Sequence, residues 1–459
     1  MTSTDLITRL GALLRDDQIS TAKDVLTEHG TDKWHASATP DVVVFPESTQ
    51  DVSDIVKFAS ANSIPVYTRA AGTGHTGGCV PVNGGILISM MRMNQIVEIN
   101  PSDGVAVTQP GVITKELGDA AREHGWYYPP DPASLKECTI GGNIATNAGG
   151  PRCLKYGVTK QYVLGLEVVL ASGEILRTGG RCHKNSTGFD LTSLMVGSEG
   201  MLGIVTEITV RLIPHPQTRA MLGASFPDFT AAAAAVQAIL DSGTLPSALE
   251  ITDGFTMAAA RVYLGADKLP PGDAYLMIEI DGNVETVARE LPKLRDFLLE
   301  HKALRIDEAS DEEACERIWQ LRRDFSYSLK HTGLTKLNED IVVPRSKLVD
   351  LVNFASQLQK DTGIPVACFG HAGDGNIHTN IMVADYADPE IKKKADGALD
   401  RLFTWVIEND GVISGEHGIG LAKKPWIRQA LGDLSINTHI AIKQALDPQG
   451  ILNPGKFLD

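Results

Sequence analysis

Glycine is gathered into a few short segments of this 459-residue chain. Thirteen of its 44 glycines lie within residues 141–203, and six lie within residues 69–88. Seven more lie within residues 370–375 and 411–420. Because glycine allows left-handed backbone and close approach of the main chain to another group, these clusters predict ligand-binding loops rather than general flexibility.

The overall composition is that of an ordinary globular protein with two or three domains. A formal net charge of −15 argues against nucleic acid as a partner. The six cysteines are scattered without a Cys-x-x-Cys pair, which argues against a disulfide framework or an iron–sulfur cluster. The first residues lack the features of a signal peptide, and no apolar run approaches the length of a transmembrane segment. We therefore expect a cytoplasmic protein, with peripheral association with the inner membrane left open.

Short apolar runs alternate with helical periodicity from Pro40 onward, as in a mixed α/β domain. In this region we expect strands at 42–45, 64–67 and 204–212, helices at 51–62 and 112–124, and a hairpin over 163–178. The two prolines at 214 and 216 predict a boundary. Beyond it we expect a strand at 275–280 and helices at 231–240, 285–299, 312–330, 346–360 and 389–407.

The first glycine cluster contains a misleading motif. Gly72, Gly74 and Gly77 fit the letters of the dinucleotide-binding fingerprint. That fingerprint requires a helix to begin at its last glycine, and the residues that follow, Gly-Cys-Val-Pro-Val-Asn-Gly-Gly, predict none. A loop of this kind can still bind phosphate when successive N–H groups turn inward as an anion nest. A plain surface turn is the alternative that the loop alone leaves open.

The second cluster begins with the run Thr139–Gly150, which is built from small residues and hydroxyl or amide donors. Few side chains in it could obstruct a flat ligand or a pyrophosphate. Residues 131–190 carry seven Lys or Arg against five Asp or Glu, a local excess that favours a phosphate-bearing ligand. The later segment 197–206 again brings glycine backbone close to another group just before a strand. Tight packing of glycines against one another is the competing interpretation.

The C-terminal half contains two conspicuous segments. His371 and His378 are seven residues apart across a glycine-rich turn, and Glu416 is followed directly by His417. Two histidines and Glu416 would form a three-ligand metal site with open positions. Adjacent residues of a strand point to opposite faces, so Glu416 and His417 should have different roles unless the nearby glycines bend the backbone. His417 could then act as an acid or base. Ordinary hydrogen-bonded loop histidines would explain the same spacing.

Arg322 is a candidate for bidentate binding of a substrate carboxylate. The adjacent Arg323 is the second choice, because the two side chains would point about 100° apart on a helix. Lys336 and Asn380 are further candidates for catalytic contacts with a substrate. A solvated helix face would account for the two arginines equally well.

Together these motifs resemble a known family, the FAD-linked D-2-hydroxyacid dehydrogenases of the vanillyl-alcohol oxidase flavoprotein superfamily. Glycolate oxidase D subunits, D-lactate dehydrogenases and D-2-hydroxyglutarate dehydrogenases are the members that it resembles most. The resemblance extends from about Pro40 to the end of the chain, and five segments carry it: 69–78, 130–134, 139–150, 197–204 and 451–456.

The resemblance implies an α+β fold. It consists of a two-part FAD-binding domain of the vanillyl-alcohol oxidase type with an inserted α+β substrate (cap) domain. The expected boundaries are 1–217 for the FAD-binding domain, 218–408 for the inserted domain, and 409–459 for a C-terminal segment that returns to the FAD-binding domain.

The resemblance also implies roles for individual residues. His371, His378 and Glu416 match the family's metal ligands, and His417 matches its active-site base. The expected divalent metal is zinc, with manganese or iron as alternatives. Arg322 matches the arginine of a Trp-x-x-Arg pattern that binds the substrate carboxylate.

A larger set of positions is expected to contact FAD. These are Arg69, Ala71, Gly72, Thr73, Gly74, His75, Thr76, Gly77, Pro132, Ser134, Thr139, Gly142, Asn143, Thr146, Asn147, Gly149, Gly150, Gly200, Gly203, Ile204 and Asn453. His75 stands where many relatives have an apolar or small residue, and covalent attachment of FAD through His75 is left open.

From these roles we expect oxidation of a D-2-hydroxyacid of the D-lactate, glycolate or D-2-hydroxyglutarate class. Hydride would pass to flavin N5 and yield the 2-oxoacid, with a divalent metal present and His417 as base. The electron acceptor would be a quinone, a cytochrome or a partner subunit, and a homodimer is the candidate assembly. Two other functions remain open: a metallohydrolase that uses His371, His378 and Glu416, and a non-catalytic FAD-binding subunit of a larger oxidoreductase complex.

Overall fold

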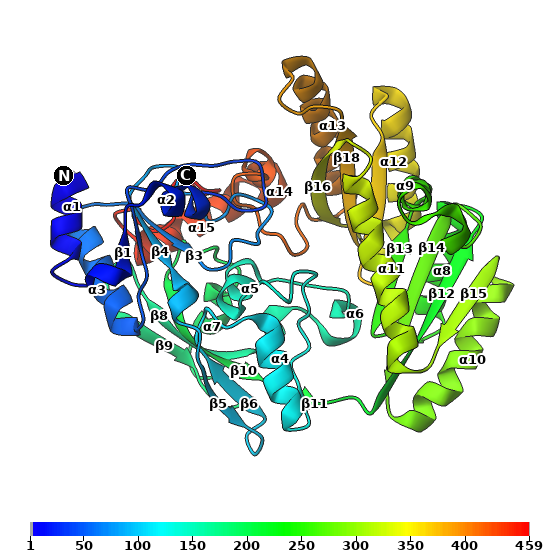
Figure 1. Cartoon of the computed structure of the whole chain (residues 1–459), viewed down its shortest axis with the longest axis horizontal. Coiled ribbons are helices and arrows are strands. Elements are labelled where there is room, and N and C mark those ends of the chain that lie inside the picture. Colours follow the sequence, from blue (N-terminus) through cyan, green and yellow to red (C-terminus); the bar gives the residue numbers. More distant parts are fainter. Residues whose placement is uncertain (1–2, 459) are drawn as a thin grey trace. The chain divides into compact units, whose positions relative to one another are not determined.

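The computed structural model describes residues 3–458. In it the chain folds into two structural units (Figure 1). Unit 1 comprises the described parts of Met1–Gly149, Val158–His215 and Glu416–Asp459. Unit 2 comprises Gly150–Gly157 and Pro216–Gly415. The sequence carried no signal that the short segment Gly150–Gly157 would pack with unit 2.

Unit 1 contains a four-stranded sheet whose central strands are parallel. Its order is β1 (Ile19–Ser20), β2 (Val42–Val44), β4 (Ile86–Ser89) and β3 (Val66–Arg69), with β1 antiparallel to β2. Val42, Val43 and Val44 are all fully buried, as expected for a parallel strand that is covered on both faces. The strand predicted at 64–67 is observed two residues further on, as β3.

A second sheet in unit 1 has five antiparallel strands. Their order is β5 (Ile96–Asn100), β6 (Val105–Thr108), β10 (Ile204–Arg211), β8 (Val163–Val169) and β9 (Ile175–Gly179). Buried and half-buried residues alternate along β10, as expected for a strand with one face in the core. The predicted hairpin over 163–178 corresponds to β8 and β9.

Helix α3 (Thr49–Ala61) joins the two sheets of unit 1 in one hydrophobic core. It begins where the hydroxyl of Ser48 accepts a hydrogen bond from the N–H of Asp51, and Val52, Ile55 and Val56 are fully buried on one face. The same core includes residues from both sheets and from α1 (Ser3–Leu10). This confirms the helix predicted at 51–62.

Unit 1 contains several further α-helices and two short strands. They are α2 (Lys23–His29), α4 (Thr114–Glu123), β7 (Trp126–Tyr127), α5 (Ile140–Thr146), α7 (Leu191–Met195), β11 (Ile213–Pro214), α14 (Ile427–Leu431) and α15 (Asp433–Leu446). The C-terminal residues join the edge of β3: Val66 N–H donates to the carbonyl of Ile451, and Asn453 N–H donates to the carbonyl of Val66. The last part of the chain thus completes unit 1.

Unit 2 is built on one antiparallel sheet of seven strands. In sheet order they are β15 (Arg305–Ala309), β12 (Thr218–Phe226), β14 (Ala274–Gly282), β13 (Ala248–Thr252), β17 (Val366–His371), β18 (Asn376–Val383) and β16 (Thr335–Val342). The helices of unit 2 are α6 (Cys153–Tyr156), α8 (Phe229–Asp241), α9 (Gly254–Leu264), α10 (Val284–Glu300), α11 (Glu312–Lys330), α12 (Leu348–Thr362) and α13 (Pro389–Glu408).

Four long helices of unit 2 begin at side-chain caps that are visible in the sequence. Asp228, Asn283, Asp311 and Asp388 each accept hydrogen bonds from N–H groups of the first turn of α8, α10, α11 and α13. Helix α11 has the predicted bounds, and the other four predicted helices match within two residues at each end. Apolar residues of α9 and α11 pack on the sheet face that carries Met221, Ala248 and Met277.

Ion pairs hold Gly150–Gly157 within unit 2. Arg152 donates from Nε to the buried carboxylate of Glu279 at 2.6 Å. Lys155 pairs with Asp281, and the hydroxyl of Tyr156 donates to the same carboxylate at 2.7 Å. Among the described residues, no helix combines the length and the apolar character needed to cross a membrane.

Candidate functional site

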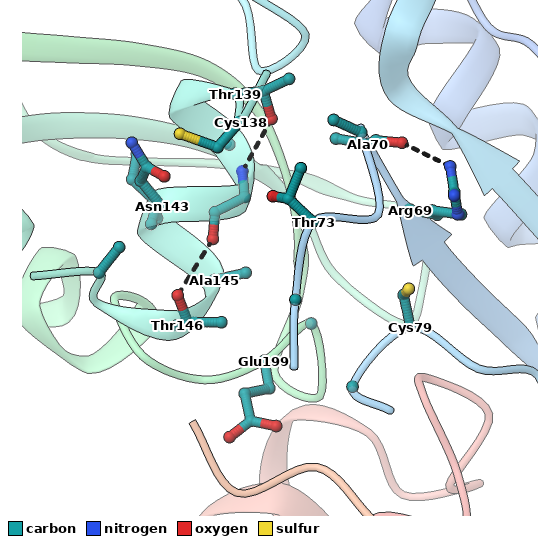
Figure 2. A pocket seen from close by; sticks show the side chains of 18 of the residues that line it. Arg69, Ala70, Thr73, Cys79, Cys138, Thr139, Asn143, Ala145, Thr146 and Glu199 are labelled. Carbon is teal, nitrogen blue, oxygen red and sulfur yellow. Dashed lines mark hydrogen bonds between the residues drawn. The ribbon is translucent and has the colours of Figure 1, made fainter. Parts of the chain in front are cut away.

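Unit 1 contains a pocket lined by the glycine-rich loops (Figure 2). Its walls come from the loop after β3, from α5 with the residues that lead into it, from residues 195–205, and from Glu416 and His417. Of the positions expected to contact FAD, the lining includes Arg69, Ala71, Gly72, Thr73, Gly74, His75, Thr76, Pro132, Ser134, Thr139, Gly142, Asn143, Thr146, Gly200, Gly203 and Ile204.

The loop after β3 forms one wall of this pocket. As predicted, no helix follows Gly77, and the chain continues as a loop to β4. Gly72 has a φ of +66°, and a Cβ there would lie 2.2 Å from the Arg69 guanidinium. Arg69 is held in place because its Nη1 donates to the carbonyl of Ala70 at 3.0 Å (Figure 2). Glycine is therefore favoured at this turn on conformational grounds, and a side chain here would also displace the Arg69 guanidinium.

The run Thr139–Gly150 contains a helix, α5, that the sequence did not predict. The hydroxyl of Thr139 accepts from the N–H of Gly142 at 3.1 Å and caps its first turn. Asn143 anchors the helix by donating from Nδ2 to the hydroxyl of Thr114 at 2.8 Å. Figure 2 shows Asn143, Ala145 and Thr146 along α5, with Thr73 of the loop beside it. The small residues leave the pocket side of the helix open.

Gly200 gives the clearest indication of whether the pocket has room for a large flat ligand. It lines the pocket with a φ of +71°, and a Cβ built on it would meet nothing within 4 Å. Any side chain at this position would therefore project into space that the glycine keeps open. The pocket fits FAD in this respect.

Five positions expected to contact FAD do not line the pocket. Gly77 donates its N–H to Asp32, Asn147 ends α5 with a φ of +52°, and Gly150 belongs to unit 2. Asn453 donates from Nδ2 to the carbonyls of Gly78 and Glu199, which lie in two pocket loops. The fifth is Gly149, the last residue of its segment of unit 1. Asn453 thus supports the pocket rather than lining it.

Glu199 is a pocket residue that the sequence reasoning missed. Its carboxylate accepts hydrogen bonds from the N–H groups of Ile419 at 2.7 Å and Gly420 at 2.9 Å. Burial raises the pKa of this carboxyl, and the two backbone bonds oppose that shift. Because it binds the turn that follows His417, Glu199 fixes the position of the predicted base. The only available signal was a charged residue inside a Gly-Ser-Glu-Gly run.

Glu416 and His417 do not point to opposite faces as a strand would require. Glu416 Oε1 and His417 Nε2 lie 3.8 Å apart. The segment is irregular because Gly418 and Gly420 have positive φ angles of +81° and +50°. The imidazole of His417 also lies beside that of His75, with ring centroids 5.1 Å apart. The structure therefore brings the predicted base and His75 together at the pocket.

In unit 2, the predicted residues Lys336, His371, His378 and Asn380 share one face of the sheet, and Arg322 of α11 contacts Glu250 on that face. Alternate residues of a strand face the same side, and directly paired residues of neighbouring strands do so too. Glu250 of β13 pairs with His371 of β17, and Phe369 of β17 pairs with His378 of β18. The residues Glu250, Arg322, Lys336, Phe369, His371 and His378 are called the unit 2 cluster below.

Short contacts hold this cluster together. His371 Nδ1 lies 2.5 Å from Glu250 Oε1, and Arg322 of α11 donates from Nε to Glu250 Oε2 at 2.7 Å. The ring centroids of His371 and His378 are 5.5 Å apart. The guanidinium carbon of Arg322 lies 4.8 Å from the centroid of the Phe369 ring, and Lys336 Nζ lies 5.6 Å from the same centroid. Two cations therefore converge on one aromatic ring beside two buried histidines.

The charges of the cluster suit an anionic ligand. Burial raises the pKa of Glu250, but His371 and Arg322 outweigh this effect and lower it to about 2, so the carboxylate is ionised. Burial, followed by repulsion from Lys330 and Arg322, lowers the pKa of Lys336 to about 8. Lys336 is thus a cation at neutral pH that an incoming carboxylate would stabilise.

Asn380 lies on the same face of the sheet, two residues after His378. Its Nδ2 donates to the carbonyls of Ala367 and His378, both at 2.9 Å. Within residues 3–458, its buried Oδ1 has no hydrogen-bond partner, and neither has the Oδ1 of its cross-strand neighbour Asn338. Buried acceptors of this kind are uncommon and indicate a place for a donor group of a ligand or water.

Asp340 is a second carboxylate that the sequence reasoning missed. It is fully buried on β16 and accepts from Asn376 Nδ2 at 2.7 Å, from Ser414 Oγ at 3.1 Å and from Gly415 N–H at 3.0 Å. Glu416 directly follows Gly415 in the chain. Asp340 therefore fixes the backbone from which the predicted metal ligand Glu416 extends.

Glu250 could have been suspected from sequence, because it is a single charge inside the otherwise uncharged strand Ala-Leu-Glu-Ile-Thr. A charged residue in a fully buried strand is seldom found unless it is paired. Its partners are 72 and 121 residues away, so no local pattern identifies them.

A glycine-lined pocket in unit 1 and a cationic, histidine-bearing cluster in unit 2 are features expected of FAD-linked oxidoreductases. Comparisons with known proteins support this class. Residues 40–179 match the FAD binding domain family, and residues 215–457 match the family of C-terminal domains of FAD linked oxidases. The chain belongs to this family of FAD-linked oxidoreductases. A metallohydrolase would leave the FAD-binding domain unexplained.

Relatives that match most of this chain refine the assignment. The chain is 40% identical over 418 residues to glycolate oxidase subunit GlcD of Bacillus subtilis, covering 91% of this chain and 89% of that protein. It is 34% identical over 430 residues to D-lactate dehydrogenase of Anaerostipes hadrus, covering 92% and 90%. The solved structure of p-cresol methylhydroxylase superposes with a TM-score of 0.83 at 20% identity, covering 99% of this chain and 96% of that one. The fold is therefore of the vanillyl-alcohol oxidase type.

Proposed function

We propose that this protein oxidises a D-2-hydroxyacid of the D-lactate, glycolate or D-2-hydroxyglutarate class to the corresponding 2-oxoacid. The observation that carries the proposal is the unit 2 cluster, in which Arg322 and Lys336 converge on Phe369 beside His371 and His378. This arrangement offers binding groups for a carboxylate and for a neighbouring oxygen. The relatives named glycolate oxidase and D-lactate dehydrogenase act on substrates of this kind.

FAD would be held in the pocket of unit 1 by the loop after β3, by α5 and by the loop at Gly200. When bound, FAD accepts the electron pair of the substrate Cα–H bond as a hydride at N5. The protein residues orient the substrate, exclude water and remove one proton. Noncovalent binding is the simpler arrangement, and attachment through His75 is a separate question that mass spectrometry would answer.

The proposed metal ligands are His371, His378 and Glu416. The chemistry of the donor set suits a divalent cation: two buried imidazoles lie close together, and one of them is held by a carboxylate through its other ring nitrogen. A bound divalent cation stabilises negative charge on a substrate oxygen. Zinc is the proposed metal, with manganese or iron as alternatives.

Arg322 and Lys336 are proposed to bind the substrate carboxylate. Because Arg322 uses Nε to bind Glu250, its Nη1 and Nη2 form the edge for bidentate recognition. Lys336 adds a second positive charge, and Asn380 would accept a hydrogen bond at Oδ1. His417 is proposed to take the proton of the substrate hydroxyl on an imidazole nitrogen while the hydride leaves Cα. The products are the 2-oxoacid, reduced FAD and a protonated His417.

The two electrons taken from the substrate would then pass to an external acceptor. The proposed acceptor is a quinone, a cytochrome or a partner subunit, and we propose the cytoplasm as the location. A homodimer is the assembly to test first. None of these proposals affects the assignment of the substrate-binding groups.

The decisive experiment is a substrate screen with the purified protein. D- and L-2-hydroxyacids are added without oxygen, and loss of the oxidised-flavin absorbance is followed with and without a chelator. We expect bleaching with a D-2-hydroxyacid and turnover when an artificial electron acceptor is added. If none of the hydroxyacids bleaches the flavin, the proposal is wrong.

A further inference from the structure

Glu250 has an unusual position in the unit 2 cluster, because its two carboxylate oxygens serve two different groups. Oε1 is 2.5 Å from His371 Nδ1, and Oε2 accepts from Arg322 Nε at 2.7 Å. The side chain is completely buried. One carboxylate therefore contacts both a proposed metal ligand and the proposed substrate-binding arginine.

The bond to His371 determines which ring nitrogen carries hydrogen. An ionised carboxylate can only accept hydrogen bonds, so the hydrogen of a neutral His371 must be on Nδ1. The lone pair of the ring is then on Nε2, which is the nitrogen available for coordination chemistry. A carboxylate in this role also raises the basicity of the ligand and fixes the plane of its ring.

The bond to Arg322 determines how the guanidinium is presented. Glu250 engages Nε, and the Phe369 ring lies 4.8 Å from the guanidinium carbon. These two contacts fix the guanidinium plane before any substrate arrives. Because a fixed donor pair loses less conformational freedom on binding, such preorganisation strengthens carboxylate recognition.

A purely structural role does not explain this arrangement well. A fully buried carboxylate is costly unless it is paired, and an apolar residue in the middle of β13 would pack without that cost. Glu279 offers a comparison within the same sheet. It is equally buried and bonds to Arg152, Arg219 and Trp319, with no imidazole among these partners.

We propose that Glu250 is a positioning residue that couples the metal site to the substrate-binding arginine. It holds His371 with hydrogen on Nδ1 and Arg322 with its Nη edge presented to the substrate. The inference rests on the proposed function, because it takes His371 as a metal ligand and Arg322 as the carboxylate-binding group.

The variant Glu250→Gln tests the proposal. An amide has one acceptor oxygen and one NH₂ donor, so it cannot accept from both His371 and Arg322. If the NH₂ faces His371, the ring must carry hydrogen on Nε2 and loses that nitrogen as a ligand. We expect the affinity of metal-stripped protein for Zn²⁺ to fall about 10–100-fold, measured by competition with a chromophoric chelator. The KM for the hydroxyacid should rise as well.

Glu279→Gln is the matched control. It also replaces a buried, arginine-paired carboxylate in the neighbouring strand β14, and both variants should lose conformational stability. Zn²⁺ affinity should stay within about twofold of wild type for Glu279→Gln, because none of the bonds described for Glu279 reaches a histidine. Equal loss of Zn²⁺ affinity in both variants, or wild-type affinity in Glu250→Gln, would overturn the proposal.

A measurement on the wild-type protein keeps the proposal testable if Glu250→Gln does not fold. Nitrogen chemical shifts of metal-stripped, ¹⁵N-histidine-labelled protein distinguish the two tautomers without the influence of a bound metal, and the signal of His371 is identified by its loss in His371→Gln. Hydrogen on Nδ1 supports the role of Glu250, and hydrogen on Nε2 contradicts it. If wild-type protein shows no Zn²⁺ affinity that depends on His371, the metal site of the proposed function is wrong. That outcome is distinct from retained affinity in Glu250→Gln.

Discussion

Lys336 shows how a single residue can link the substrate chemistry to stability. Its ammonium lies against the Phe369 ring with no carboxylate among the groups that shift its pKa, while Lys330 and Arg322 repel it. The folded protein therefore holds a cation that water would solvate better. A bound anion would compensate for this, which is a reason to expect such a residue in a site for carboxylates.

This arrangement predicts a pH-dependent effect of Lys336→Met. The folded state lowers the pKa of Lys336 to about 8, whereas the unfolded state keeps it near its ordinary value of 10.5. The unfolded state thus binds more protons between these values, and the destabilisation present below pH 8 is relieved as the pH rises toward 10.5. We expect the variant to be more stable than wild type by about 3 kcal/mol at pH 7 and by much less at pH 10. Urea unfolding at both values measures this difference, and a difference that does not change with pH would contradict it.

His417→Ala tests the proposed base. We expect turnover of the hydroxyacid to fall about 10²–10⁴-fold, while FAD stays bound, because most of the pocket lining is untouched. Steady-state kinetics and the visible absorbance of the flavin provide the two measurements. His439→Ala, at an exposed position of α15, is the control that should retain wild-type activity. Full activity of His417→Ala would exclude this residue as the base.

At the scale of elements, α5 shows how a short helix can serve a pocket. It has only seven residues, and such a helix is marginal without capping and tertiary contacts. Thr139 and Asn143 supply these contacts at its start and middle. The small side chains between them then leave the pocket face open.

Thr139→Ala should therefore weaken both stability and cofactor binding. Loss of the cap is expected to cost about 1 kcal/mol of unfolding free energy and to lower FAD affinity several-fold. Thr139→Ser, which keeps the hydroxyl, should behave like wild type. Asp228→Ala removes the cap of α8 in unit 2 and should cost similar stability with no change in FAD affinity. Thermal unfolding and flavin titration of the apoprotein distinguish these results, and unchanged FAD affinity in Thr139→Ala would contradict the role of α5.

At the scale of the whole molecule, the chain passes between the two units four times, at 149/150, 157/158, 215/216 and 415/416. The last crossing lies between Gly415, which Asp340 binds, and Glu416, which lines the pocket of unit 1. The proposed reaction uses groups from both units: the pocket and His417 belong to unit 1, and the carboxylate-binding residues belong to unit 2.

This division predicts that metal and flavin can be removed independently. Treatment with a strong chelator should abolish hydroxyacid oxidation, and added Zn²⁺ should restore it. FAD should remain bound throughout, since only Glu416 of the three proposed metal ligands is among the residues that line the pocket, and chelation removes the metal but leaves its side chain in place. Metal analysis, flavin absorbance and activity are measured on the same sample. Full activity after verified loss of metal would exclude a catalytic metal.

The local sequence determined a large part of the molecule. Helix caps such as Ser48 and Asp311, the apolar periodicity of α3 and α11, and the absence of a helix after Gly77 all depend on residues within a few positions of one another. The same holds for alternation along the sheet, which places His371 and Phe369 on one face. The pocket loops were also recognisable, because glycines at special backbone angles cannot be replaced without strain.

Tertiary structure alone decided which charges meet. Glu250 binds partners 72 and 121 residues away, Asp340 binds Gly415 across 75 residues, and Gly150–Gly157 is held in unit 2 by Glu279 and Asp281. The helical character of α5 did not follow from local pattern either. A buried charge requires a partner, but its own neighbours in the sequence do not specify which one. That choice is made only when the folded strands bring distant residues into register.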